Sequence, residues 1–320
     1  MTLDLVTLGE SMVLLVAEQA GPLREATTFR RHVAGAESNV AIGLRRLGHT
    51  AGWVSRLGDD DFGRAVLFRI RGEGVDTSRV ILDAAAPTAV FFRERHIGSQ
   101  ARPIEVVYYR RGSAASRLSV ADLDADYIRG ARWLHLTGIT PALSASCREA
   151  VFAAAEIARG AGLPVVLDPN YRSKLWTSDE ARRVLRDLAS RCDVVLPGLE
   201  EAELLTGESQ PEAAARQLAA SGPRTVVVKL GAQGALAVAD DRVIRAPALL
   251  LERVVDPVGA GDAFAAGLLA GLLRGLPIEA ALDLANRCGA YAMTAPGDME
   301  ALPLWHEVAG PRPSSQDIRR

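Results

Sequence analysis

Lysine, cysteine and long apolar runs are all scarce in this chain. Only Lys174 and Lys229 are lysines among its 37 basic residues, so Lys229, at the end of an apolar run, is of interest. The three cysteines, Cys147, Cys192 and Cys288, are widely spaced. They form neither a disulfide framework nor a zinc-binding pattern, and we expect buried thiols in a reducing compartment. No apolar run reaches the roughly 18 residues that a membrane-spanning helix needs.

The charge balance and the first residues narrow the possibilities further. A formal net charge of −2 provides no basic surface for nucleic acid or for a membrane. The first residues run into an apolar segment without the basic region of a signal peptide. We therefore expect a cytoplasmic protein that binds small molecules, with no nucleic-acid or membrane partner.

Strand-like and helix-like segments alternate along most of the chain. The strand-like segments are 3–8, 52–57, 133–136, 165–167, 194–196 and 226–228, and the helix-like ones are 39–47, 61–72, 144–159, 179–189 and 211–220. The alternation predicts a mainly parallel sheet with helices on both faces, a three-layer α/β/α fold that binds ligands beyond the carboxyl ends of its strands. We expect one domain over 1–310 and a flexible tail at 311–320.

Two segments, near 10–34 and 87–111, differ from the core in residue composition and in the length of their apolar runs. Their short runs at 89–92 and 106–109 are rich in aromatic and β-branched residues and are separated by a polar stretch. This pattern predicts a small antiparallel β-sheet that acts as a lid. An exposed sheet edge can pair with a second copy, so we also expect a homo-oligomer.

The most informative motif is Gly259-Ala260-Gly261-Asp262, which precedes an apolar run ending at Leu273. It predicts a tight turn that opens a buried helix, whose first-turn amides attract an anion. A carboxylate beside a bound phosphate is explained by a general base for phosphoryl transfer. The alternative is an ordinary helix start with Asp262 in the first turn.

Two further polar segments that follow strands are candidate binding sites, each with a plain structural alternative. Lys229 to Gly234 follows a strand, and its glycines suit close passage of a nucleotide, or else a simple turn. The cluster Asp168 to Arg172 also follows a strand. Arg172 can bind phosphate or carboxylate there, unless the segment is a capped turn.

The lid and the first helix supply the remaining candidates. Strand alternation places Tyr108 and Arg110 on one face, which suits an anionic, hydroxyl-rich ligand as well as a solvated edge strand. Within Gly35-Ala36-Glu37-Ser38-Asn39 one side chain caps the helix, and the amide of Asn39 is a candidate for binding a sugar diol.

These segments, in this order, resemble the ribokinase-like (PfkB) carbohydrate kinases from Leu3 to about Leu304. The resemblance implies an α/β kinase with a β lid that uses ATP and Mg²⁺. It makes Asp262 the general base, and it makes the amides of Gly259, Ala260 and Gly261 the anion hole.

Within that family the chain is most similar to the 2-keto-3-deoxygluconate kinases, through segments 108–116, 136–141 and 168–176. The resemblance implies phosphorylation of the terminal hydroxyl of that sugar acid. The implied substrate-binding residues are Gly35, Ala36, Glu37, Ser38, Asn39, Phe91, Tyr108, Arg110, Asp262 and Asp298. The implied nucleotide-binding residues are Asn170, Arg172, Lys229, Gly231, Gly234 and Asn286, together with the anion hole.

Three positions depart from the family pattern, and the mildest is Ala34, which replaces the first glycine of a pair common before the first helix. Gly198 stands where an asparagine near the metal is expected, so only Glu201 remains there, as a metal contact through water. Phe91 stands where a tyrosine would offer a hydroxyl group to the substrate. The alternatives are a neutral-sugar kinase, such as a fructokinase, and a non-catalytic regulator that binds sugar or nucleotide.

Overall fold

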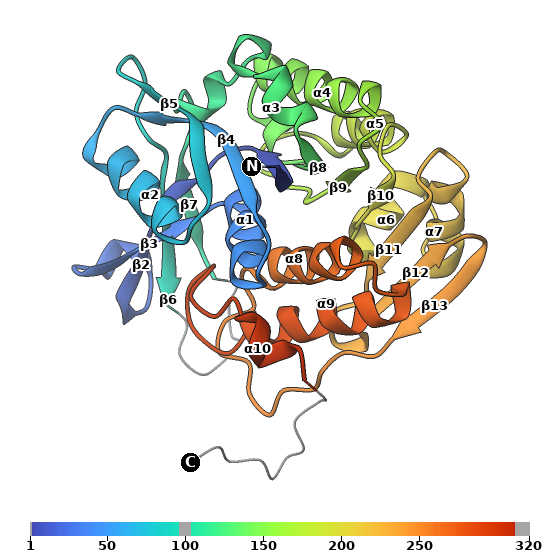
Figure 1. Ribbon diagram of the computed structural model, residues 1–320. Helices are drawn as coiled ribbons and strands as arrows, with labels where there is room; N and C mark the ends of the chain where they lie inside the picture. The colour runs from blue at the N-terminus through green and yellow to red at the C-terminus, as the bar shows by residue number, and fades with distance from the viewer. Residues whose placement is uncertain (1, 96–103, 311–320) are drawn as a thin grey trace.

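The computed structural model describes residues 2–95 and 104–310, and it is built around a nine-stranded sheet (Figure 1). Across the sheet the order is β13-β12-β11-β10-β9-β8-β1-β4-β5. The strands are β1 (Leu3–Leu8), β4 (Ala51–Gly58), β5 (Asp76–Asp83), β8 (Ala131–Thr137), β9 (Val165–Asp168), β10 (Val194–Val195), β11 (Thr225–Lys229), β12 (Ala235–Ala239) and β13 (Arg242–Ala246). All neighbouring strands are parallel except the β11–β12 and β12–β13 pairs.

Helices cover both faces of this sheet, which confirms the predicted three-layer α/β/α fold. One face packs against α1 (Ala36–Arg46), α2 (Asp61–Gly72), α8 (Ala260–Leu273), α9 (Ile278–Ala292) and α10 (Trp305–Val308). The other packs against α3 (Ala125–Arg129), α4 (Ala145–Gly160), α5 (Ser178–Ala189), α6 (Leu199–Thr206) and α7 (Pro211–Ala219). Strand β1 is covered on both faces, because Leu5 faces the first layer, whereas Val6 and Leu8 face the second.

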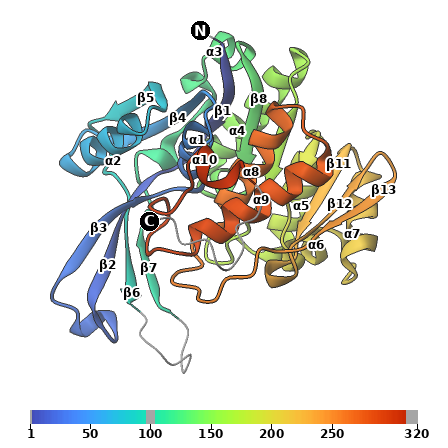
Figure 2. The ribbon, with the colours of Figure 1, turned by 60° about the horizontal axis from the view of Figure 1, so that its bottom comes forward.

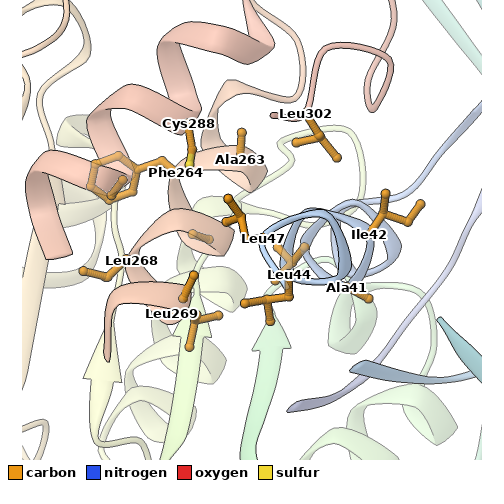
Figure 3. Packing of buried hydrophobic residues seen from close by; sticks show 14 of the residues in the cluster. Ala41, Ile42, Leu44, Leu47, Ala263, Phe264, Leu268, Leu269, Cys288 and Leu302 are labelled. Carbon is orange, nitrogen blue, oxygen red and sulfur yellow. The ribbon is translucent and has the colours of Figure 1, made fainter. Parts of the chain in front are cut away.

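Helix α8 is enclosed by its neighbours, which explains its small apolar residues. Its side chains meet those of α1 and α9, including Ala263 and Leu268 (Figure 3). A Cβ at Gly267 would lie 2.8 Å from the Cα of Ala285, so the two helices approach more closely than larger residues allow. A helix that is apolar on all sides must be buried on all sides, and this burial fixes the position of its first turn.

The lid is a second sheet that projects from one end of the core (Figure 2). It contains β2 (Met12–Ala20), β3 (Phe29–Ala34), β6 (Val90–Arg95) and β7 (Val106–Tyr109), in the order β3-β2-β6-β7. Its strands fall within the segments near 10–34 and 87–111, and the predicted antiparallel pairing of the runs at 89–92 and 106–109 is confirmed, because β6 and β7 pair antiparallel. Strands β2 and β6 pair in parallel. The predicted tail, 311–320, and positions 96–103 of the predicted lid lie outside the described residues. Across the part that is described, no helix has the length and apolar character to span a membrane.

Candidate active site

A cavity of about 460 Å³ lies at the carboxyl ends of the sheet strands, between the core and the lid. Strand β9 ends in Asp168, β11 ends in Lys229, and Glu10 follows β1, and all three side chains line it. The lid contributes Phe91 and Tyr108. The cavity is therefore at the edge where the sequence predicts ligand binding.

Most of the predicted site residues line this cavity, and some do not. Those that line it are Gly35, Ala36, Phe91, Tyr108, Arg110, Asn170, Arg172, Glu201, Lys229, Gly259, Gly261, Asp262 and Asp298. Those outside its lining are Glu37, Ser38, Asn39, Ala260, Gly231, Gly234 and Asn286. The lining also includes Glu10 and Arg93, which the sequence did not indicate, and Asp168, which belongs to a predicted polar cluster but was given no role of its own.

The predicted tight turn opens α8 at the base of the cavity. Gly259 has a φ of 79°, in the left-handed region that favours glycine. A Cβ there would clash with the carbonyl oxygen of Asp298, so glycine is also required by the close approach of a second loop. The first-turn amides of α8 have no partner within the helix and lie at its positive end, which makes this turn a site for an anion.

Asp262, in that first turn, faces the cavity with a carboxylate held by α1. Its Oδ2 accepts a hydrogen bond of 2.8 Å from the side-chain amide of Asn39. Loss of hydration, together with the charges of Asp168 and Asp298, raises the pKa of Asp262 to about 7 against the opposing effect of this bond. A carboxylate with a pKa near neutrality is well suited to accept a proton.

The ammonium group of Lys229 lies close to the same turn. Its Nζ donates to Oδ2 of Asp168 at 2.7 Å, and a Cβ at Gly261 would lie 3.9 Å from that Nζ. Burial alone would lower the pKa of Lys229, but the carboxylates of Asp168, Glu201 and Asp262 together raise it. A permanent positive charge therefore stands beside the first turn of α8, where it suits a phosphate group.

Glu201 has a structural role that the sequence did not reveal. Its Oε2 accepts from the amide of Gly198 and its Oε1 from the amide of Tyr171, both at 2.7 Å. The carboxylate thereby caps α6 and joins it to the loop after β9. Among the described residues no cluster of three or more potential ligands could hold a metal ion by itself.

The lid side of the cavity combines an aromatic stack with a buried ion pair. Phe91 stacks on Tyr108 with ring centroids 5.0 Å apart. Arg110 donates through Nε to Oε2 of Glu10 at 2.8 Å, and Ser113 donates to the other oxygen. Part of the guanidinium group of Arg110 is thus already neutralised within the protein.

Arg172 is different, because it has no ion pair or side-chain hydrogen bond within the described part of the chain. It is exposed, it lines the cavity, and its charge lowers the pKa of Asp262 against the larger effect of burial. It is the better placed of the two arginines to bind an incoming carboxylate or phosphate.

The segment Gly35–Asn39 splits between the cavity and the core. Gly35 and Ala36 line the cavity, whereas Glu37 is fully buried and accepts hydrogen bonds from Thr137 and Thr140 at 2.6 and 2.7 Å. Ser38 donates to the carbonyl oxygen of Gly35. Glu37 therefore ties α1 to the end of β8, whereas Ser38 bonds within the start of its own helix, and neither side chain lines the cavity where the substrate site was predicted.

A side chain of α9 holds the backbone beside the segment that is predicted to bind nucleotide. Asn286 on α9 donates to the carbonyl oxygens of Ala246 and Pro247 at 3.1 and 3.2 Å. Gly234 has a φ of 92°, and a Cβ there would clash with the carbonyl oxygen of Ala246. Gly231, Gly234 and Asn286 belong to this framework beside β11, and their contact with nucleotide stays a prediction.

Comparison with known proteins agrees with the fold. The model of the pfkB family of carbohydrate kinases matches residues 2–305. The chain belongs to this family of kinases. A 2-dehydro-3-deoxygluconokinase of Bacillus subtilis (strain 168) is 42% identical over 312 residues, which are 97% of this chain and 95% of that protein.

Experimental structures of similar proteins have the same fold. A PfkB protein from Polaromonas sp. JS666 is 43% identical, with a TM-score of 0.87 over 97% of this chain and all of that one. An Escherichia coli protein provisionally named Ribokinase II, in complex with ATP and Mg²⁺, is 27% identical, with a TM-score of 0.89 over 96% of this chain and 97% of that one.

Proposed function

We propose that this chain transfers the γ-phosphoryl group of ATP to the terminal hydroxyl group of 2-keto-3-deoxygluconate (2-dehydro-3-deoxygluconate), giving the 6-phosphate and ADP. The main support is Asp262, a cavity carboxylate with a pKa of about 7 beside the first turn of α8. The similarity to 2-dehydro-3-deoxygluconokinase supports the substrate.

In this mechanism each cavity group has one task. The carboxylate of Asp262 accepts the proton of the sugar hydroxyl group as its oxygen bonds to the γ-phosphorus and the bond to ADP breaks. The first-turn amides of α8 and the ammonium group of Lys229 stabilise the charge on the transferring group. The lid excludes water, which would otherwise hydrolyse ATP.

The metal is expected to arrive with the nucleotide. Mg²⁺ usually binds through one or two carboxylates together with substrate phosphates, so the small acidic set in this cavity fits it. Asp168 and Glu201 are the carboxylates that would hold it, the latter through water, and when bound it would neutralise phosphate charge.

A substrate panel tests the proposed reaction. ADP release is measured with 2-keto-3-deoxygluconate, with related sugar acids and with neutral ketoses such as fructose. We expect the highest kcat/KM with 2-keto-3-deoxygluconate. A higher kcat/KM with fructose would replace the proposal with a fructokinase, and no ADP release with any sugar would favour a binding protein.

The arginine that selects a sugar acid is predicted to be Arg172. An interaction with a charged partner contributes ~1.5–3 kcal/mol, so Arg172→Ala should lower kcat/KM for the sugar acid by roughly 10- to 150-fold and change it little for a neutral sugar. Arg111→Ala is the control, because Arg111 is exposed and lies outside the cavity lining. Equal losses on both kinds of sugar would contradict carboxylate binding by Arg172. Arg110→Ala is less informative, because it leaves buried Glu10 without its ion-pair partner.

The raised pKa of Asp262 predicts the pH dependence. A general base works only when it is deprotonated, so kcat/KM should rise with pH and level off above about 7. The pKa of Asp298 is also raised by burial, to about 6. The charge of Asp298 contributes to the raised pKa of Asp262, so Asp298→Asn should move the inflection below about 7 without abolishing it, whereas Asp262→Asn should abolish it. A kcat/KM that is constant between about pH 5 and 8 would contradict the assignment of the base.

A further inference from the structure

A buried ion pair joins the lid to the loop that precedes α8. Arg93, on lid strand β6, donates through Nη2 to Oδ2 of Asp256 at 2.6 Å, and its Nη1 lies 3.5 Å from Oδ1. Arg93 and Asp256 are only 6% and 8% exposed. The fork of the guanidinium group matches both carboxylate oxygens, which is the geometry of a specific pair rather than of a loose surface contact.

The same carboxylate organises two loops of the core. Oδ1 of Asp256 accepts from the amide of Val258 at 3.2 Å, in the turn that leads into α8. Oδ2 accepts from the amide of Gly297 at 3.3 Å, in the loop that carries Asp298. The carbonyl oxygen of Asp298 in turn occupies the space beside Gly259 where a side chain would lie. Asp256 therefore holds both loops against each other where the anion-binding turn begins.

Arg93 is also the cation between two carboxylates. Its Nη1 lies 4.0 Å from Oδ1 of Asp298, in addition to its contacts with Asp256. If Arg93 were removed, two buried carboxylates would face each other without this counter-charge, and the loops that carry them would separate.

We propose that Arg93 is a positioning residue for phosphoryl transfer: from the lid, it holds Asp256 and thereby sets the turn formed by Gly259 to Asp262. This inference rests on the proposed kinase function. The lid is then more than a cover, because one of its side chains completes the support of the anion-binding turn. The competing explanation is that Arg93 only tethers the lid to the core.

Chemical rescue separates these two roles. Free guanidinium can restore the charge beside Asp256 but cannot reconnect the lid to the core. In Arg93→Ala we expect kcat to fall about 100-fold, as for a small misplacement of reacting groups, with little change in the sugar KM. Guanidinium chloride, at concentrations far below those that unfold proteins, should raise the kcat of Arg93→Ala about tenfold or more, compared with sodium chloride at equal ionic strength. The double variant R93A/D256N should be slow and should show no recovery.

Arg95→Ala is the matched control, because Arg95 lies two residues along the same strand, is exposed and donates to the carbonyl oxygen of Glu18 within the lid. It should keep the parental kcat. The proposal would be overturned if R93A kept the parental kcat. It would also be overturned if R93A, shown to be folded by a cooperative thermal transition, recovered no kcat with guanidinium, or if R93A/D256N did recover it. If R93A does not fold, R93A/D256N replaces it in the test, because neither member of the pair is then charged. A parental kcat in R93A/D256N would also overturn the proposal.

All rates are taken relative to the parent on whichever sugar the parent phosphorylates. An error in the proposed substrate therefore leaves the test of Arg93 intact, whereas the substrate panel alone decides the proposed function.

Discussion

Asp262→Asn should lower kcat by roughly 10²–10⁴-fold while changing the KM for sugar and ATP only modestly. Asparagine has nearly the size of aspartate, and its carbonyl oxygen can still accept the hydrogen bond that Asn39 donates. What it lacks is the ability to take the proton of the sugar hydroxyl group. Steady-state kinetics, with ATP and sugar varied separately, measures the two effects.

The thermal stability of this variant separates loss of the base from loss of the fold. The pKa of Asp262 in the folded chain is about 7, above its ordinary value of 3.8, so ionising this carboxyl group costs folding free energy as pH rises from 3.8 through about 7. Asparagine avoids that cost, and the Tm of the variant at pH 8 should equal or exceed that of the parent.

Asp61→Asn is the control for this prediction, because Asp61 is also in the first turn of a helix but is fully exposed on α2. Its kcat should remain at the parental value. Turnover near the parental rate in Asp262→Asn would remove the general base from the mechanism.

Local sequence signals predicted the core of the fold and the turn that opens α8. The strand from 165 and the helix ending near 159 follow from apolar periodicity, and the Gly259–Asp262 turn follows from its glycines and the apolar run after it. Strands β5, β12 and β13 were missed. β5 and β13 lie at the two edges of the sheet and are only partly buried, so neither has a continuous apolar pattern. β12 lies next to β13 and is fully buried, but three of its five residues are alanine, which is uncommon in strands.

The parts of the site that the sequence did not reveal depend on pairs far apart in the chain. Glu10 and Arg110 are 100 residues apart, and Arg93 and Asp256 are 163 residues apart. Neither pair has a local pattern, because each forms only when the lid packs on the core. Glu37 is a second such case: the family resemblance implied a place in the substrate site, whereas Thr137 and Thr140, about 100 residues away, bind its carboxylate in the interior.

Gly259→Ala should have an effect comparable with that of losing the base. A non-glycine residue in the left-handed region costs about 1–2 kcal/mol, and here the new Cβ would also clash with the carbonyl oxygen of Asp298. One of the two loops must move. Because both line the cavity, we expect kcat to fall by about 100-fold, as for a displacement of reacting groups by about 1 Å. Kinetics and thermal unfolding, measured on the same preparation, provide the two readouts.

Gly275→Ala separates the clash from the backbone strain. Gly275, just beyond the other end of α8, has a φ of 69°, but a Cβ there would meet nothing within 4 Å. Both variants should lose similar free energy of unfolding from the left-handed backbone, and Gly259→Ala should lose more because of the clash. Only Gly259→Ala should lose turnover. If both variants kept the parental kcat, phosphoryl transfer would not depend on the fit between Gly259 and the loop of Asp298. If both lost it equally, turnover would follow the stability of α8 as a whole rather than the shape of its first turn.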